Sequence, residues 1–374
     1  MKKILLVFGT RPEAIKMCPL IPALRKYPEA RVAVCVTGQH RQLIQPMLDA
    51  FQVTPEYDLS IGTPGQTLFD ITGRILDRLP PVLESERPDI VLIHGDTTTA
   101  FAAALCCFYL RIPVGHVEAG LRTYDPAAPY PEEFNRHCVD VISRWCFAPT
   151  EQCRENLLRE GRPPEAVYVT GNTVIDALRT TVRADYRHPE LDWAGDGRLL
   201  LVTAHRRENL GEPMRRMFRA IRRIAEDHPD VRVIYPIHPN PAVRRLAREE
   251  LAGCGRIHII EPLGVTDFHN FLARSYLVLT DSGGIQEEAP ALGRPVLVMR
   301  GATERPEGIA AGALCLAGTD EETIYSKCHA LLSSPEEYRR MANASNPYGD
   351  GTACEKIAAI LLRDKEEKKE TPIK

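Results

Sequence analysis

Short apolar runs alternate with longer amphipathic stretches along this chain. The runs are rich in Val, Ile and Leu and too short for helices, which predicts buried β-strands. The predicted strands are 3–8, 31–36, 90–93, 114–117, 145–148, 167–169, 199–203, 231–235, 257–260, 277–280 and 296–299. The stretches between them fit helices, including a long one that opens at Pro64 and runs to about Leu83. This alternation predicts an α/β fold with parallel, doubly wound sheets.

The alternation pauses between residues 183 and 197, where Pro, Gly and Asp interrupt any period, and then restarts. We place the linker or its edge there. The chain is therefore expected to form two Rossmann-like halves that face each other across a cleft, the usual place for a ligand. The charged tail from Asp364 is expected to fray.

Composition narrows the class of protein. The 374 residues favour two domains, and 44% hydrophobic with 26% charged residues is typical of a soluble globular protein. A net charge of −3 favours neither nucleic acid nor an anionic membrane. No apolar run approaches the roughly 20 residues that span a bilayer. The opening MKKILLVF superficially resembles a signal peptide, but it lacks a cleavage site, so we interpret it as the first strand.

Eleven cysteines occur without a CxxC pair, and most lie in apolar surroundings. Cysteine commonly packs as a small hydrophobe. The odd number and the lack of a disulfide framework favour a reducing, cytoplasmic location. Cys and His show no metal-ligand spacing, so no metal is expected.

Acidic residues follow two consecutive predicted strands in the first half. Asp96 follows strand 90–93, and Glu118 follows strand 114–117. Because ligands bind outside the carboxyl ends of parallel strands, the two carboxylates should lie side by side at a site. Two structural alternatives stay open: Asp96 as the N-cap of the next helix, and Glu118 as the salt-bridge partner of Arg122.

Further charged groups are expected at the same edge of the first sheet. Glu132 and Arg136 lie in a third cluster, PEEFNR, so acid/base chemistry near a negative group is plausible. Thr10 and Glu13 have capping-box spacing at the first helix start. That start would offer N–H groups to an anion, unless it is only an ordinary capped helix.

The second half has its own clusters at strand ends. His205 and two arginines follow strand 199–203 and suit a phosphate, although His205 could simply cap the helix. The run Ser282-Gly283-Gly284 follows strand 277–280 and lets backbone N–H groups approach a pyrophosphate. Glu288, farther along that helix, could accept the two hydroxyls of a ribose.

Taken in order, these motifs resemble the non-hydrolysing UDP-N-acetylglucosamine 2-epimerases of bacteria. The resemblance runs essentially end to end, through FGTRPEAIKMCPL, HGDTTT, PVGHVEAGLRT, PEEFNR, TGNTVIDAL, AHRREN, TDSGGIQEEAP, TERPE and NPYGDG. It implies the two-domain fold of many nucleotide-sugar glycosyltransferases (GT-B-like), with the last helix crossing back to the first domain. The implied domains are 1–172 with about 355–374, and 173–354.

The resemblance also implies the reaction, reversible epimerisation at C2 of UDP-N-acetylglucosamine to give UDP-N-acetylmannosamine. UDP leaves from C1, a C2 proton is lost to give a 2-acetamidoglucal, and UDP re-adds. The implied enzyme needs no cofactor, forms a homodimer and supplies surface polysaccharide. Closure of the domains about Thr170-Gly171-Asn172 is a further hypothesis, because the intermediate must stay trapped.

Residue roles follow from the resemblance alone. The implied catalytic residues are Asp96, Glu118, Glu132 and His205, with His205 on the diphosphate. The implied substrate contacts are Arg11, Lys16 and Arg136 for the departing diphosphate, and Ser282, Gly283, Gly284, Glu288, Arg305 and the backbone near Phe268 for UDP. A regulatory substrate site is implied at Gln39, Gln42, Gln66, Glu132, Arg206 and His238. Some members have Arg where this chain has Gly65, which weakens the case for regulation.

Three other functions compete with this interpretation. A glycosyltransferase of the same fold would need no carboxylate cluster in the first domain. The hydrolysing relative often carries a fused sugar kinase, for which this chain is too short. A non-catalytic UDP-sugar sensor could lose Asp96, Glu118 and Glu132, all of which are present.

Overall fold

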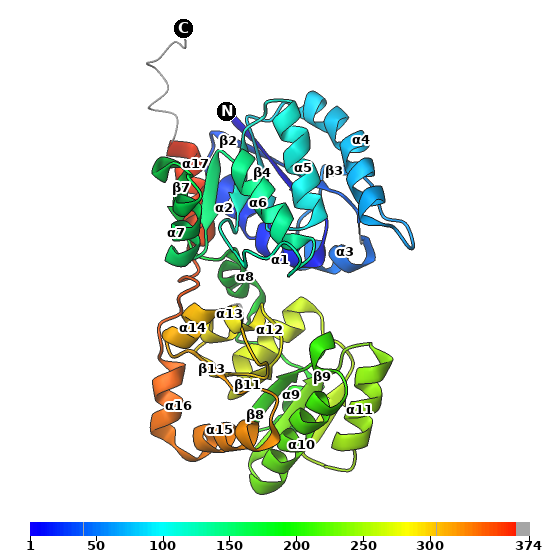
Figure 1. The fold of residues 1–374 in the computed structure, drawn as a ribbon, viewed down its shortest axis with the longest axis vertical. Coiled ribbons are helices and arrows are strands. Elements are labelled where there is room, and N and C mark those ends of the chain that lie inside the picture. Colours follow the sequence, from blue (N-terminus) through cyan, green and yellow to red (C-terminus); the bar gives the residue numbers. More distant parts are fainter. Residues whose placement is uncertain (40, 304, 364–374) are drawn as a thin grey trace. The chain divides into compact units, whose positions relative to one another are not determined.

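The computed structural model describes residues 1–39, 41–303 and 305–363. The chain divides into two compact units, Met1–Thr180 with Gly349–Lys374, and Thr181–Tyr348 (Figure 1). Each unit has its own parallel sheet, which confirms the two doubly wound halves. The charged tail from Asp364 lies outside the described residues.

The first unit is built on a seven-stranded parallel sheet in the order β3-β2-β1-β4-β5-β6-β7. Its strands are β1 (Lys2–Phe8), β2 (Ala30–Val36), β3 (Tyr57–Asp58), β4 (Ile90–His94), β5 (Val114–Val117), β6 (Trp145–Ala148) and β7 (Val167–Val169). The strand order reverses between β1 and β4. Ligands of open α/β sheets bind at such a switch point, outside the carboxyl ends of the strands.

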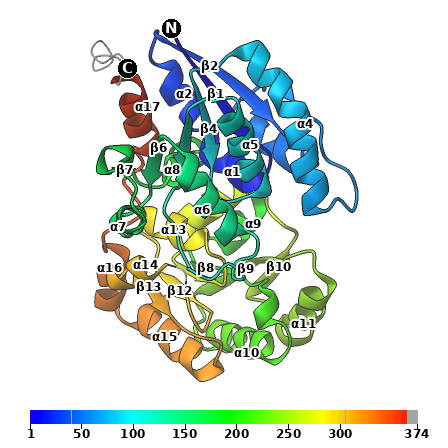
Figure 2. The ribbon, with the colours of Figure 1, turned by 45° about the horizontal axis from the view of Figure 1, so that its top comes forward.

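Helices cover both faces of this sheet (Figures 1 and 2). They are α1 (Arg11–Met17), α2 (Leu20–Arg25), α3 (Arg41–Ala50), α4 (Leu68–Glu86), α5 (Thr98–Tyr109), α6 (Glu132–Ile142), α7 (Glu151–Arg159), a 3₁₀ turn (Pro164–Ala166), α8 (Thr173–Thr181) and α17 (Ala353–Arg363). The apolar stripe of α4 packs with α5 and the sheet, around Ile75 and Leu79. This burial is what stabilises both helices.

The last helix belongs to the first unit, as the family resemblance predicts. α17 packs against α2, and the Lys2 ammonium donates a hydrogen bond of 2.6 Å to the Leu361 carbonyl oxygen. The Asp176 carboxylate accepts from the backbone N–H groups of Ala353, at 3.2 Å, and Cys354, at 2.9 Å. These bonds satisfy N–H groups that the helix start leaves without partners.

The second unit repeats the design on six parallel strands, in the order β10-β9-β8-β11-β12-β13. They are β8 (Arg198–Thr203), β9 (Val231–Pro236), β10 (Ile257–Ile260), β11 (Leu277–Thr280), β12 (Val296–Val298) and β13 (Leu314–Leu316). The helices are α9 (Pro189–Ala194), a 3₁₀ turn (Arg207–Asn209), α10 (Glu212–Asp227), α11 (Pro241–Leu251), α12 (Val265–Arg274), α13 (Ile285–Ala291), α14 (Pro306–Ala310), α15 (Glu321–Ser333) and α16 (Pro335–Ala342). The switch point lies between β8 and β11.

The structure differs from the sequence-based expectation in three places. β3 and β13 were not predicted, and both are edge strands of two or three residues, too short to show a period. The segment expected as a linker, 183–197, contains α9, whose Leu191 packs into the hydrophobic core of the second unit. By contacts the division falls at Thr180–Thr181, so α8 lies with the first unit, whereas the expected boundary was residue 172.

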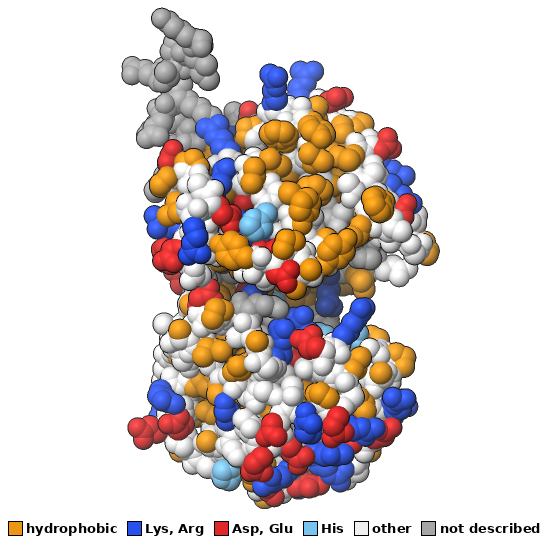
Figure 3. Space-filling view, viewed as in Figure 1, with side chains coloured by type: hydrophobic (Ala, Val, Ile, Leu, Met, Phe, Trp, Pro, Cys, Tyr) orange, Lys and Arg blue, Asp and Glu red, His pale blue; other side chains and the backbone are white. Residues whose placement is uncertain are grey.

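Large apolar side chains are exposed on three neighbouring helices of the first unit. They are Phe69 of α4, Phe108 and Tyr109 of α5, and Phe134 and Val141 of α6, each more than half exposed. Figure 3 shows apolar side chains gathered on this unit. We call these five residues the outer apolar surface. Within the described ranges, no helix combines the length and the hydropathy that crossing a bilayer would require.

Candidate active site

Glu13 joins the two strand ends at the switch point of the first unit. Its carboxylate accepts from the backbone N–H groups of Gly9 and Thr10, at 3.0 and 2.7 Å, and from the Thr97 hydroxyl at 2.7 Å. The turn after β1 is thereby tied to the turn after β4. This arrangement sets the start of α1, which carries Arg11 and Lys16. No described carboxylate pairs with the exposed Arg11.

Glu118 is the most constrained carboxylate of this site. It follows β5 with a backbone φ of 69°, a left-handed conformation that is strained for a residue with a Cβ. The Lys16 ammonium forms an ion pair with Oε2, and Asn172 Nδ2 donates to the same oxygen at 2.7 Å. His94 Nε2 lies 3.6 Å away. The alternative pairing with Arg122 is wrong, because Arg122 pairs elsewhere.

The ionised form of Glu118 is favoured by its neighbours. Burial alone raises the pKa of this carboxyl, but the Lys16 ammonium and the His94 ring outweigh burial and hold the pKa well below its usual range. Glu118 is therefore ionised at neutral pH and able to accept a proton.

Asp96 is held by a second cation. Its carboxylate forms an ion pair with the Arg136 guanidinium of α6, and its carbonyl oxygen accepts from Asn135 Nδ2 at 2.9 Å. The N-cap of α5 is Thr97, whose hydroxyl accepts from the Ala100 N–H at 3.0 Å. The capping role considered for Asp96 is therefore wrong, and its side chain points toward α6.

The two glutamates at the start of α6 have different surroundings. Glu133 is 1% exposed and accepts from the backbone N–H groups of Thr123 and Tyr124, at 3.1 and 2.8 Å. It holds the loop that precedes α6. Glu132 is half-buried, and no hydrogen bond or ion pair joins it to another described residue. Glu132 is thus the acid of this pair that remains available to a substrate.

Two residues of this site were not singled out from the sequence. Asn172 lies in the motif TGNTVIDAL but was considered only as a hinge, and its contact with Glu118 spans 54 positions. His94 is buried, and neither ring nitrogen has a hydrogen-bond partner in the described part of the chain, although Nε2 lies 3.6 Å from the Glu118 carboxylate. Buried ring nitrogens without a hydrogen bond are costly in a protein interior and often mark function. In the sequence, the one feature that could have indicated a role for His94 was its position at the end of a predicted strand.

Asp281 organises the switch point of the second unit. It follows β11, is fully buried, and accepts from the backbone N–H groups of His205 and Arg206, each at 2.9 Å. Asn209 Nδ2 donates to it as well, at 3.2 Å. The loop after β8 is therefore fixed through its backbone, and His205 presents its ring instead of capping a helix.

The glycine-rich turn after β11 leads into α13 as predicted. Ser282 N–H donates to the Thr280 hydroxyl at 2.9 Å, which shapes the turn before Gly283 and Gly284. Glu288 Oε2 lies 3.6 Å from His269 Nε2, and Arg305 forms an ion pair with Glu287.

Phe268 lies on α12, where it is partly buried and packs against the hydrophobic core of the second unit. The structure thus places the predicted UDP contacts of the second unit at the switch point, on the helices α12 and α13, and, for Arg305, at the start of α14.

The residues of the implied regulatory site fall into two groups. In the first unit, Gln66 Nε2 donates to the Gln39 carbonyl oxygen at 3.3 Å, whereas Gln42 is exposed on α3. In the second unit, the His238 ring stacks on the His205 ring with centroids 5.3 Å apart. Arg206 Nε donates to the Asp281 carbonyl oxygen at 3.2 Å.

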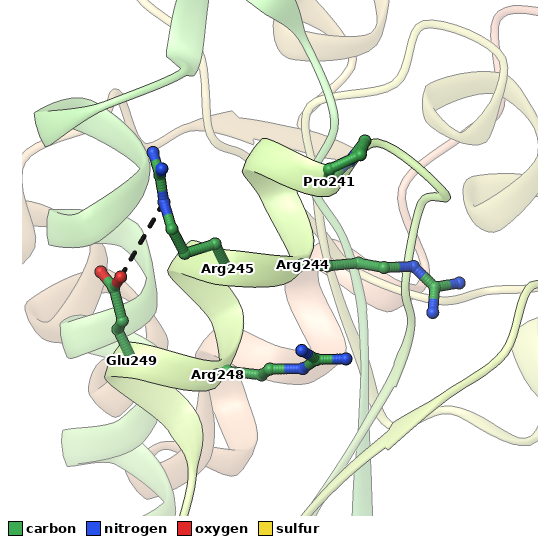
Figure 4. Close-up of a pocket in the computed structure, with 5 residues that line it drawn as sticks. All are labelled: Pro241, Arg244, Arg245, Arg248 and Glu249. Carbon is green, nitrogen blue, oxygen red and sulfur yellow. Dashed lines mark ion pairs between the residues drawn. The ribbon is translucent and has the colours of Figure 1, made fainter.

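A pocket of about 360 Å³ lies on the outer face of α11 (Figure 4). Three arginines and a glutamate line it, but Arg244 is bound by Glu261 at 2.6 Å and Arg245 pairs with Glu249 at 3.9 Å. These pairings are typical of a solvated charged helix face.

Two doubly wound parallel-sheet units, each with charged residues at its switch point, define the two-domain α/β class that many nucleotide-sugar enzymes share. A model of the UDP-N-acetylglucosamine 2-epimerase family matches residues 22–362. The chain therefore belongs to the UDP-N-acetylglucosamine 2-epimerase family.

Individual relatives agree with this assignment over nearly the whole chain. The UDP-N-acetylglucosamine 2-epimerase of Bacillus subtilis is 56% identical, covering 99% of this chain and 97% of its own length. The Escherichia coli K12 enzyme of the same name is 47% identical, over 97% and 99%. The crystal structure of UDP-GlcNAc 2-epimerase from Neisseria meningitidis bound to UDP-GlcNAc superposes with a TM-score of 0.87, at 46% identity over 96% of this chain and 100% of that one.

Proposed function

We propose that this protein catalyses the reversible epimerisation of UDP-N-acetylglucosamine at C2, giving UDP-N-acetylmannosamine. Membership of the family supports the reaction, and the three carboxylates of the first unit support its chemistry. The anomeric C–O bond breaks first and UDP leaves from C1; a C2 proton is then removed, which leaves a 2-acetamidoglucal. UDP then re-adds at C1 while a proton returns to C2 on the opposite face.

The chemistry requires this order of bond breaking. An acetamido group is no electron sink, so the C2 proton is not acidic enough for direct removal. Breaking the anomeric C–O bond first builds positive charge at C1, which acidifies C2 and favours nearby carboxylates. Inversion then needs acid/base groups on both faces of the sugar ring.

The observation that carries the proposal is the different environment of each carboxylate. Glu118 is held ionised by Lys16, and Asp96 is paired with Arg136. Glu132 has no partner among the described residues and is free to reach a substrate. In the proposal these acids exchange protons with C2, and the cations, with Arg11, stabilise the departing diphosphate.

The second unit holds the nucleotide in this proposal. The turn Ser282-Gly283-Gly284 offers backbone N–H groups to the diphosphate, and the exposed edge of the His205 ring contacts it. Glu288 accepts from the ribose hydroxyls, Arg305 adds positive charge, and the backbone near Phe268 contacts uracil. Because Asp281 fixes the backbone of the neighbouring loop, His205 is oriented before the nucleotide binds.

We also propose a homodimer that forms through the outer apolar surface. The surface presents five large apolar side chains on adjacent helices, a pattern that marks interaction sites in soluble proteins. A cytoplasmic location is supported by the eleven cysteines, all of which are free thiols. Regulation by substrate remains a proposal for Gln39, Gln42, Gln66, Arg206 and His238.

Proton NMR with UDP-N-acetylglucosamine in D2O tests the reaction. The expected result is UDP-N-acetylmannosamine, with deuterium at C2 of both sugars. Free N-acetylmannosamine with UDP would indicate the hydrolysing activity instead. An unchanged spectrum from protein that binds UDP would favour the transferase or the sensor.

Three variants test the carboxylates: Asp96→Asn, Glu118→Gln and Glu132→Gln. Each is expected to lower kcat by at least about 100-fold, because a positioned acid or base contributes that much to proton transfer. UDP affinity, measured by calorimetry, should be retained. Glu355→Gln, which removes an exposed glutamate on α17, is the matched control. Near-normal turnover in all three variants would refute the assigned roles.

A further inference from the structure

A buried histidine that is not one of the proposed catalytic residues bridges the two loops that carry Asp96 and Glu118. His116 lies within β5 and is fully buried. Its Nδ1 is 2.6 Å from Asp140 Oδ1 of α6, and its Nε2 is 2.8 Å from the carbonyl oxygen of Gly95. Both ring nitrogens therefore face oxygen atoms at hydrogen-bonding distance.

The partners determine the protonation of the ring. A carbonyl oxygen only accepts hydrogen bonds, so Nε2 must carry a hydrogen. Asp140 forms an ion pair with Arg122 at 2.8 Å, and its Oδ2 accepts from the Gly120 N–H at 3.2 Å. This pairing favours the carboxylate, which is also an acceptor, so Nδ1 carries a hydrogen too. A ring with both hydrogens is an imidazolium.

The surrounding charges support a positive ring. Arg122 pairs with Asp140 at 2.8 Å and with Glu160 at 2.6 Å, so one guanidinium is shared by two carboxylates, and a positive ring would balance the second negative charge. Cys146 lies opposite His116 in the ladder with β6, and burial raises the pKa of its thiol to about 12, so it is neutral. Buried charges are tolerated when they are paired and hydrogen-bonded in this way.

The same contacts hold both carboxylate-bearing loops. Gly95, held by His116, directly precedes Asp96. On the other side, Asp140 Oδ2 accepts from the Gly120 N–H at 3.2 Å, just beyond Glu118. The three joined elements are the loop after β4, the loop after β5 and α6.

We propose that His116, as a buried imidazolium bound to Asp140, is a positioning residue for the epimerisation. It sets the separation of Asp96 and Glu118 without touching the substrate. The inference rests on the proposed function for the reaction that it serves. A neutral ring has only one N–H, so loss of the proton would leave either Gly95 or Asp140 without a donor. Turnover should therefore depend on this charge, whereas UDP binding should not.

Joint neutron and X-ray diffraction of the full-length wild-type protein at neutral pD reads the ring directly. The expected result is deuterium on both nitrogens of His116. Deuterium on one nitrogen would overturn the inference. This measurement needs no variant, so it decides the question even where a substitution prevents folding.

Kinetics test the positioning role with His116→Gln and Asp140→Asn. Each is expected to lower kcat at least about tenfold with KM changed less than about twofold, since the carboxylates lose alignment. Both constants are taken per folded molecule, so a merely structural role, which only lowers the amount of folded protein, would leave kcat unchanged.

The matched control is His258→Gln, which removes a histidine bound to a carboxylate, Glu190, at 2.7 Å in the second unit. It should turn over as the wild type does. Wild-type kcat per folded molecule in both His116→Gln and Asp140→Asn would overturn the inference. A wild-type protein without epimerisation would instead refute the proposed function, an outcome distinguished by the NMR assay.

Discussion

Replacing Lys16 by Met should destabilise the first unit strongly, because it leaves the charge of Glu118 buried. The two side chains are only 14% and 9% exposed. Removing one partner of a buried ion pair costs about 3–5 kcal/mol. Asn172 still donates to the carboxylate at 2.7 Å, so we expect the lower end, about 3 kcal/mol. For a domain of this size, that loss lowers Tm by roughly 6–12 °C.

An exposed pair in the same unit provides the matched control. Lys26 and Glu355 are 3.0 Å apart, with side chains 66% and 55% exposed. Exposed ion pairs contribute about 0.2–1 kcal/mol, so Lys26→Met should cost no more than that. The two substitutions remove the same chemical group, so burial is the main difference between them.

The cost should also depend on pH. The pKa of Glu118 in the folded protein is well below 4.5, because Lys16 and His94 outweigh burial. A carboxyl with a lowered folded pKa stabilises the protein above its unfolded pKa, and this contribution is lost as the pH falls below about 4.5 toward the folded pKa. The gap between wild type and Lys16→Met should therefore narrow in acid.

Urea unfolding at pH 7 and pH 4, followed by circular dichroism, measures these differences. The double variant Lys16→Met/Glu118→Gln should recover at least about 1.5 kcal/mol relative to the sum of the single changes, because glutamine carries no charge. If Lys16→Met cost no more than Lys26→Met, or if the two single changes were additive, the reasoning about the buried pair would be refuted.

Three further outcomes are expected. Burial lowers the pKa of His269 from 6.5 to about 4, so below pH 6.5 the unfolded state binds more protons than the folded state. The free energy of unfolding of the wild type should therefore fall by up to about 3 kcal/mol toward pH 4. Urea unfolding should show a smaller dependence on pH for His269→Gln, and an equal dependence would contradict this. Gly120→Ala should lower the free energy of unfolding by at least about 2 kcal/mol, because φ is 86° and the added Cβ would lie 2.3 Å from the Cys153 carbonyl oxygen. Thermal unfolding measures this loss, and an unchanged Tm would contradict the prediction. Phe69→Ser with Phe108→Ser should give a monomer in sedimentation, and an intact dimer would exclude the outer apolar surface as the interface.

Much of the fold could be predicted because its signals are local. Short apolar runs located eleven of the thirteen strands in the part of the chain that the structure describes, since a buried parallel strand is apolar on both faces. Glu13 bonding back to the turn before α1 depends on residues three or four positions apart. The strand-end positions of Asp96, Glu118 and Ser282 followed from the same pattern, because each lies within three residues of the end of an apolar run.

The partners of those residues were decided by the tertiary structure. Lys16 is 102 positions from Glu118 and Arg136 is 40 from Asp96, so no local spacing connects them. The sheet order brings β1, β4 and β5 together, and this order follows from how crossovers pack, which a single sequence does not display. For the same reason, the bridge from His116 to Asp140 and Gly95 could be found only in the folded chain. Periods and caps are properties of neighbouring residues, whereas the charge state of a buried group depends on partners that only folding brings within reach.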